Sequence, residues 1–264
     1  MKCRFIFIFM IAAGVALESS LEKMKTLEEF TIPYLVYLEA NPEPCVGSLI
    51  HPKWVLTAAH CSLPKKIRLG VYQPSTKNTN EQLQNYSLTV THPEFDGKSL
   101  KNDLMLIKLS KSADFGLHVG TIAIAIEPVS LTDSCFIPSW TWNNYKNLTD
   151  PDILTWINQH FLSSQKCLNM LQRQEQRTSV NILCVGKPLI VLSNIKVGSS
   201  LNQEGKTNLD VQRGLEVSAS PAICSGRVHG ILSWTKGVIT LGSEGFFTEV
   251  HPYARWIMEI ISTH

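Results

Sequence analysis

Short runs of β-type residues, separated by turn residues, are the feature that most restricts the fold of this chain. Several short strands at modest spacing are typical of an all-β barrel or sandwich. The sequence therefore predicts an all-β fold. The expected strands include Tyr34 to Leu38, Trp54 to Ala58, Leu104 to Leu109, Ile122 to Ile126, Ile153 to Ile157 and Val228 to Trp234.

The C-terminus has a different pattern. Apolar residues recur there at helical spacing and follow Pro252, and proline is a good first-turn residue. This spacing predicts one closing helix. Its apolar residues are Tyr253, Trp256, Ile257, Ile260 and Ile261.

The first residues predict a secretory signal peptide over residues 1–17. Lys2 and Arg4 precede an apolar run that ends before Glu18, and Gly14 to Ala16 supply small residues at the usual cleavage spacing. A membrane anchor is the alternative, but a span needs about 20 apolar residues. We therefore expect a secreted, extracellular protein with no membrane span after cleavage.

Composition and charge exclude some classes of function. With 44% hydrophobic and 17% charged residues, the chain is an ordinary globular protein of 264 residues, long enough for a sizeable core. A net charge of +2 is too mild to indicate a nucleic-acid partner. No cluster of metal ligands stands out, so we expect no metal and no cofactor. Nothing in the sequence indicates an oligomeric state.

Seven cysteines are present, and one of them, Cys3, falls in the predicted signal peptide. The other six form an even set in an oxidising compartment, which predicts a disulfide framework. Their number alone allows fifteen pairings.

Five segments in a fixed order resemble the trypsin/chymotrypsin (S1) family of serine proteases. The TAAHC and NDLMLIKL segments are the most specific of them, and the similarity covers nearly all of the chain after about residue 30. Within the family the chain is similar to divergent trypsin-X-like members, which keep a serine in an EVSA-type segment. The five segments are Ile32 to Leu38, Gly47 to Ile50, Trp54 to Cys61, Asn102 to Leu109 and Gly230 to Trp234.

This resemblance implies a fold and a domain organisation. The fold would be two six-stranded antiparallel β-barrels of the chymotrypsin type with a C-terminal α-helix. From its apolar face we expect the closing helix to pack on the second barrel. The peptidase domain would cover residues 31–264. Residues 18–30 would form a short segment without a recognisable activation site.

The resemblance also selects one disulfide pairing. Each bond would stabilise the fold by about 2–4 kcal/mol. Gly214 and Val238 stand where the family has a further pair beside the substrate pocket, so that bond is missing. The implied pairs are Cys45 with Cys61, Cys135 with Cys224, and Cys167 with Cys184.

Three residues match the family's catalytic positions: His60, Asp103 and Ser218, in the order His, Asp, Ser. A serine hydroxyl needs an imidazole to take its proton and a carboxylate to orient that imidazole. Ser220 is an alternative nucleophile by position. An ordinary turn aspartate or loop serine is the competing interpretation for Asp103 and Ser218.

Two substitutions beside the serine predict poor catalysis. Glu216 stands where the family has a glycine whose N–H contributes to the oxyanion hole, and a carboxylate there would repel the developing negative charge. Val217 replaces the aspartate that pairs with the amine freed by zymogen cleavage. The segment before Ile32 also shows no Arg or Lys followed by Ile-Val-Gly-Gly, so the activation pair is missing from both sides.

The substrate-binding positions are altered as well. Gln212 falls where trypsin carries an acidic residue, which argues against cleavage after Lys or Arg. Ala219 and Ser220 replace two glycines and are expected to add bulk near a bound ligand. Ser233 and Trp234 keep the pattern of the strand that pairs with a substrate backbone, so peptide binding by β-addition stays feasible.

Two sequons, at Asn85 and Asn147, fit surface glycans on a secreted protein.

Two functions remain open. One is an active serine endopeptidase of non-tryptic specificity acting on a protein or peptide substrate. The other, which the substitutions favour, is a family member with impaired or no peptidase activity, a pseudoprotease that binds a protein partner.

Overall fold

The structure is a computed structural model that describes residues 31–141, 153–172, 181–186, 191–193, 217–235 and 245–264. The predicted signal peptide, the segment 18–30 and the predicted glycan site at Asn147 lie outside these residues. From Ile32 onward the chain forms one compact unit that holds two β-sheets.

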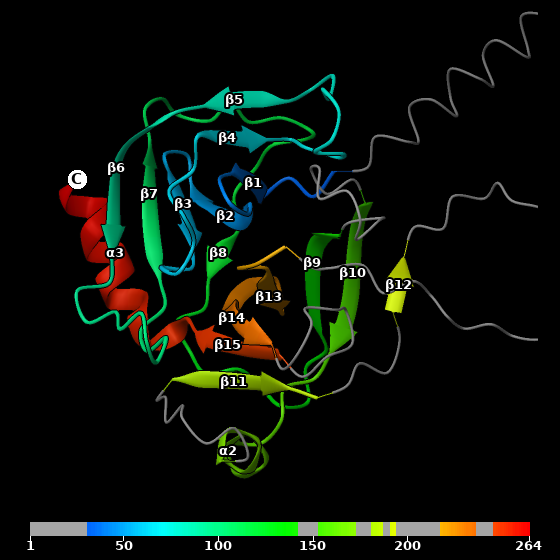
Figure 1. The fold of residues 1–264 in the computed structure, drawn as a ribbon, viewed down its shortest axis with the longest axis vertical. Coiled ribbons are helices and arrows are strands. Elements are labelled where there is room, and N and C mark those ends of the chain that lie inside the picture. The colour runs from blue at the N-terminus through cyan, green and yellow to red at the C-terminus, as the bar shows by residue number, and fades with distance from the viewer. Residues whose placement is uncertain (1–30, 142–152, 173–180, 187–190, 194–216, 236–244) are drawn as a thin grey trace, which may run out of the picture. The chain divides into compact units, whose positions relative to one another are not determined.

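The first sheet has seven strands in the order β5-β4-β1-β2-β3-β7-β6 (Figure 1). Neighbouring strands of this sheet pair antiparallel, and β3 is fully buried between β2 and β7. The strands are β1 (Leu35–Glu39), β2 (Cys45–His51), β3 (Trp54–Thr57), β4 (Lys66–Leu69), β5 (Gln82–Gln84), β6 (Tyr86–Thr91) and β7 (Met105–Leu109).

The second sheet has eight strands. Seven follow the order β11-β15-β14-β13-β9-β10-β12, and β8 pairs in parallel with β14. The strands are β8 (Ala123–Ile124), β9 (Cys135–Thr141), β10 (Ile153–Gln159), β11 (Ile182–Val185), β12 (Val191–Ser193), β13 (Pro221–Cys224), β14 (Arg227–Thr235) and β15 (Gly245–Glu249).

The predicted fold class is confirmed: the protein is mostly β, with two antiparallel sheets and a C-terminal helix. The sheets contain more strands than six each. In the first, a single residue, Asn85, separates β5 from β6. In the second, β8 and β12 are only two and three residues long. Breaks and short pairings of this kind leave little hydrophobic pattern in a sequence.

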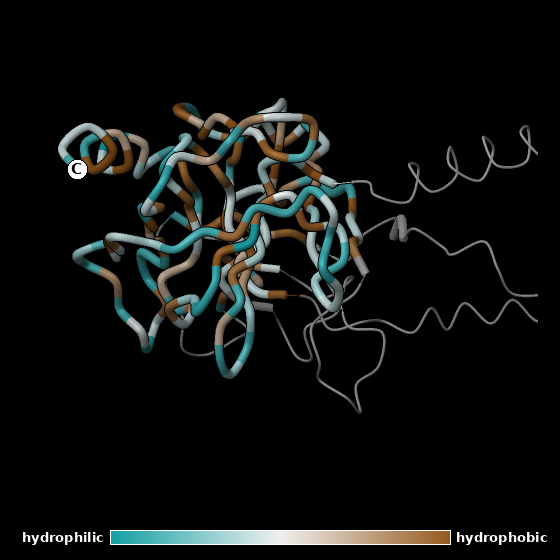
Figure 2. The backbone as a smooth tube through the Cα atoms, turned by 90° about the horizontal axis from the view of Figure 1, so that it is seen from above, coloured by the Kyte–Doolittle hydropathy of each residue, from teal (hydrophilic) through white to brown (hydrophobic). Residues whose placement is uncertain are grey.

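The main hydrophobic core draws on both sheets. It includes Trp54 and Leu56 of the first sheet and Val228 and Ile231 of the second, all nearly inaccessible to solvent. Figure 2 shows apolar stretches along the strands, whereas several projecting loops are hydrophilic. This shared core fixes the loops of the two sheets against each other.

Three helical segments complete the described chain. They are α2 (Ser164–Gln172), the 3-10 turn η1 (His251–Tyr253) and α3 (Ala254–Thr263). None of the helices in the described ranges is long and apolar enough to cross a membrane.

The expectation that the closing helix packs on the second sheet is wrong. Helix α3 lies beside β6 and β7 (Figure 1), and the carbonyl of His264, the residue after the helix, accepts a hydrogen bond from Lys108 of β7. The ring of Trp256 packs against the ring of His92, the residue after β6, with 4.9 Å between the two ring centroids. Ile257 is buried in the core cluster that the first sheet dominates. Helical spacing identifies an apolar face but not the surface that covers it.

Three disulfides are present, with the pairing that the family resemblance implied. Cys45–Cys61 closes a loop of the first sheet, and Cys135–Cys224 joins β9 to β13. Cys167–Cys184 ties α2 to β11. Cys61 directly follows His60, and Cys224 closes the strand that follows Ser218, so the first two bonds brace the segments that carry these two candidate catalytic residues.

Candidate active site

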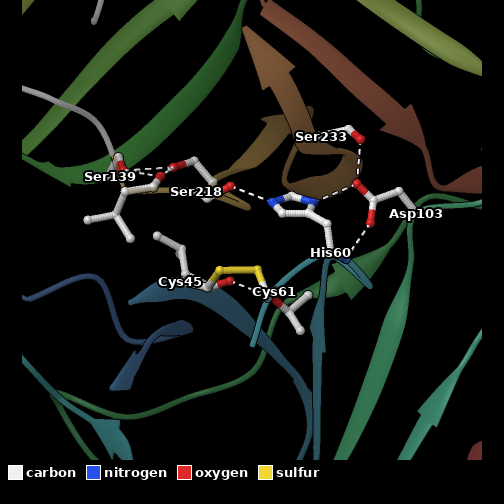
Figure 3. The surroundings of a disulfide bond; sticks show 11 residues. Cys45, His60, Cys61, Asp103, Ser139, Ser218 and Ser233 are labelled. Carbon is white, nitrogen blue, oxygen red and sulfur yellow. Dashed lines mark hydrogen bonds and ion pairs between the residues drawn. A yellow bond between two sulfur atoms is a disulfide. The ribbon is translucent and has the colours of Figure 1, made fainter. Parts of the chain in front are cut away.

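His60 lies in a turn that directly follows β3. The Cys45–Cys61 bond ties this turn to β2, and the hydroxyl of Thr57, the last residue of β3, donates to the Val46 carbonyl at 2.7 Å. These two anchors hold the imidazole over the junction of the sheets (Figure 3).

Asp103 is fully buried and fixes His60 twice. Its Oδ1 accepts the backbone N–H of His60 at 2.8 Å, and its Oδ2 lies 2.7 Å from His60 Nδ1. Because a carboxylate can only accept, Nδ1 carries the proton, and Nε2 is left as an acceptor.

Ser218 lies on the other side of the imidazole, with its Oγ 2.6 Å from His60 Nε2 (Figure 3). Its own carbonyl accepts the N–H of Val46 at 2.8 Å, which ties the serine to β2. The structure therefore joins the three positions that the sequence singled out through one line of hydrogen bonds.

The residue before Asp103 has its own support. Asn102 has a positive φ of 56°, a conformation that asparagine tolerates better than most residues. Its side chain donates to the Glu94 carbonyl at 2.8 Å and accepts from the Tyr253 hydroxyl at 2.7 Å. Burial raises the pKa of Tyr253, so this hydroxyl stays protonated and can donate.

Ser233 has a contact that sequence reasoning missed. It was assigned to the substrate-binding strand, but its hydroxyl is buried and donates to Asp103 Oδ2 (Figure 3). The carboxylate thus receives three donors, two from His60 and one from Ser233. The order of residues along β14 could not show this contact, because Asp103 lies 130 residues earlier in the chain, just before β7 of the other sheet.

The expectation for Ala219 and Ser220 is also corrected. Both side chains are fully buried: Ala219 packs in the main core, and the Ser220 hydroxyl contacts Ser139 and the Val217 carbonyl. They do not add bulk toward a ligand. Instead, Ala219 adopts a φ of +66°, which costs an L-residue other than glycine about 1–2 kcal/mol.

Val217 is fully buried among apolar and aromatic side chains, including Ile32, Leu35 and Trp140. Its N–H donates to the Trp140 carbonyl at 3.0 Å. Apolar contacts therefore hold this position where the family resemblance implied a charged pair.

Three further predicted positions receive little description. Gln212 and Glu216 lie outside the described residues. Trp234 lies in β14 opposite Phe246, and only its backbone is described.

One group of residues has the composition of a metal site. The ligand atoms of Cys45, His60 and Cys61 all lie within 4.8 Å of one another. Both sulfurs are joined in a disulfide, so neither supplies the thiolate that a metal would bind. This group therefore supports no metal centre.

Comparison with known proteins identifies this arrangement. The family described as Trypsin matches residues 25–200, a range that includes His60 and Asp103. "Serine protease 58" of Homo sapiens is 34% identical over 236 residues, 89% of each chain. "Probable inactive serine protease 58" of Bos taurus is 32% identical over 240 residues, 90% of each chain. "Trypsin" of Sus scrofa is 30% identical over 235 residues, 89% of this chain and 92% of the relative.

Proposed function

Since the chain belongs to the trypsin family of serine proteases, we propose that it is a secreted member with an assembled Ser-His-Asp relay and severely impaired hydrolysis of peptide bonds. The observation that carries the first half is the contact of Ser218 Oγ with His60 Nε2, while Asp103 holds Nδ1. The substitution of glycine by Glu216 carries the second half.

The relay has the geometry for nucleophilic attack. As Ser218 Oγ forms a bond to a substrate carbonyl carbon, its proton would pass to His60 Nε2 over 2.6 Å. Asp103, bonded to both the backbone and the ring of His60, would stabilise the imidazolium that results. His60 would then protonate the leaving amine.

Poor stabilisation of the oxyanion is the proposed cause of the slow hydrolysis. Much of the barrier reduction comes from donors aimed at the developing negative charge, and losing one donor lowers the rate by about 10²–10³. A β-carbon at position 216 disfavours the backbone conformation that glycine adopts there. The Glu216 carboxylate would also repel the negative charge of the tetrahedral intermediate. A bovine relative carries the name "Probable inactive serine protease 58", which supports the same conclusion.

The substrate class follows from the family: a protein or peptide. Secretion and glycosylation are part of the proposal. Three disulfides favour an oxidising compartment, and Asn85 and Ser87 of the first sequon are exposed. The signal peptide over residues 1–17 supplies the route.

A fluorophosphonate probe tests the relay, because it reacts only with an activated serine. We expect slow labelling of the secreted protein, about 10²–10³ slower than pig trypsin under the same conditions. Ser218→Ala should abolish labelling, whereas Ser225→Ala, at an exposed serine that bonds Asp133, should leave it unchanged. Labelling as fast as trypsin would establish the alternative, an active endopeptidase of non-tryptic specificity. No labelling would overturn the relay and favour a binding scaffold.

Restoring the glycine tests the cause of the impairment. Glu216→Gly should raise the labelling rate by about 10²–10³, because it restores the donor and removes the negative charge. Glu216→Gln removes the charge alone and should give a smaller gain. The rate constant of labelling at fixed probe concentration measures both effects. A rate that stays the same in both variants would contradict the assignment of Glu216.

A further inference from the structure

Two buried hydroxyls lie beside the segment that carries Ser218. Ser139 belongs to β9 and Ser220 precedes β13, and both are fully buried. Ser220 Oγ donates to Ser139 Oγ at 2.7 Å and also lies 3.0 Å from the Val217 carbonyl. Ser139 Oγ lies 3.2 Å from the same carbonyl. Figure 3 shows Ser139 beside the segment that carries Ser218.

We propose that Ser139 and Ser220 act as positioning residues for Ser218, by anchoring the peptide unit between Val217 and Ser218. This inference rests on the proposed function, since it names what holds the nucleophile in place. When Ser220 donates to Ser139, the nearest carbonyl for the Ser139 proton is that of Val217, ahead of the Trp140 carbonyl at 3.4 Å.

The anchor completes a series of fixed peptide units. The Val217 N–H donates to the Trp140 carbonyl, the two hydroxyls hold the Val217 carbonyl, and the Ser218 carbonyl accepts the Val46 N–H. Three successive peptide planes around the nucleophile are therefore each held by a hydrogen bond. A peptide unit is planar and trans, so fixing the Val217 carbonyl also fixes the direction of the Ser218 N–H. The amide of the nucleophile is one of the donors that stabilise the oxyanion in this chemistry.

This protein has a particular need for such an anchor. Ala219 occupies a left-handed conformation directly after Ser218, and such strain persists only where the surroundings hold it. Val217 cannot form the ion pair that orders this segment in the family. The hydroxyl pair is part of the folded chain from the start, so the positioning that it provides needs no proteolytic cleavage.

The test compares Ser139→Ala, Ser220→Ala and the double variant in the full secreted protein and in the Glu216→Gly background. We expect each single variant to slow probe labelling only slightly, because the remaining hydroxyl still lies within hydrogen-bond distance of the Val217 carbonyl, at 3.0 Å for Ser220 or 3.2 Å for Ser139. The double variant removes both donors and should slow labelling by about 10–100-fold, because small displacements of reacting groups cost rates of that size.

Thr155→Val is the matched control. It removes a neighbouring buried hydroxyl whose hydrogen bond goes to the Ser139 carbonyl, at 3.5 Å, and not to the Val217 carbonyl. All labelling rates are measured at a temperature below the thermal unfolding transition of every variant. Slowing in Thr155→Val equal to that in the double variant would show a general structural effect and overturn the proposal, as would labelling of the double variant at the parent rate.

Hydrogen–deuterium exchange of the segment from Val217 to Cys224 gives a readout that does not depend on catalysis. We expect exchange there to be about 10-fold faster or more in the double variant, with β7 unchanged. Unchanged exchange in this segment overturns the positioning role. If the parent protein cannot be labelled at all, the relay fails while the exchange result still decides the role of the two serines.

Discussion

Val217→Asp is expected to lower the free energy of unfolding by about 4 kcal/mol or more at pH 7. The substitution restores the residue of the family at this position, but it buries a carboxyl group among Ile32, Leu35 and Trp140. Burial disfavours the charged form, so the side chain stays protonated in the folded protein. Keeping it protonated costs about 1.4 kcal/mol for each pH unit above its ordinary pKa of about 3.9.

The effect has a defined pH dependence. Burial raises the pKa of the new carboxyl in the folded state, so the destabilisation grows as pH rises above about 4 and fades as pH falls toward 4. Val217→Asn is the matched control of equal size, and its cost, about 1–3 kcal/mol for an unpaired buried amide, should not change with pH. Urea denaturation at pH 4.5 and pH 7.5, each referred to the parent protein, measures the difference.

The same substitution separates two explanations of slow labelling, the missing aspartate at position 217 and the glutamate at position 216. If the missing aspartate alone were responsible, Glu216→Gly with Val217→Asp would label faster than Glu216→Gly. We expect the double variant to label more slowly, because the buried carboxyl disturbs the segment that carries Ser218. A stable and faster double variant would show that an amine reaches this position after all.

How much of the site the sequence reveals depends on the kind of contact. His60, Asp103 and Ser218 lie in segments that match motifs of the family, so the resemblance selected them, with Ser220 left as an alternative to Ser218. The hydroxyl of Ser139 gave no signal, because a serine in a strand is ordinary until its partner across the sheet is known. Ser139 and Ser220 are 81 residues apart in the chain.

The same limit applies to the fold. The strands that alternation and turn residues predicted by name lie within a residue or two of the observed bounds, for example Trp54–Thr57, whereas the seven-residue strand β9 was not among them. They did not predict helix α2, whose nine residues have only three buried side chains and therefore a weak apolar face. They also gave the wrong surface for α3, because its position depends on His92 and Lys108, far away in the sequence.

A buried ion pair organises a loop next to the first sheet. Arg68 of β4 donates to both carboxylate oxygens of Glu81, at 2.6 and 2.9 Å, and both side chains are less than a tenth exposed. The same guanidinium donates to the carbonyls of Pro74 and Thr76 at 2.7 and 2.9 Å. One side chain thus satisfies four acceptors within the loop that ends at Glu81.

Arg68→Met is expected to destabilise the protein by about 3–5 kcal/mol at pH 7, because it leaves the Glu81 carboxylate without its cation and the buried Pro74 carbonyl without this donor. The double variant Arg68→Met/Glu81→Leu should recover part of this loss, since no buried charge remains. Lys66→Ala, which removes an exposed ion pair to Glu39 at 3.4 Å, is the control and should cost less than about 1 kcal/mol.

The titration of Glu81 should make the effect of Arg68→Met on stability depend on pH. Burial alone would raise its pKa, but the hydrogen bonds from Arg68 and Asn78 outweigh burial and lower it below the ordinary value. A lowered folded-state pKa contributes stability above the unfolded value of about 4.5, and that contribution is lost as pH falls through the folded-state pKa. The difference in unfolding free energy between the parent and Arg68→Met should therefore be largest near neutral pH and shrink below about 4.5. A difference that stays constant from pH 7 to pH 4 would assign the loss to the carbonyls of Pro74 and Thr76 and not to the carboxylate.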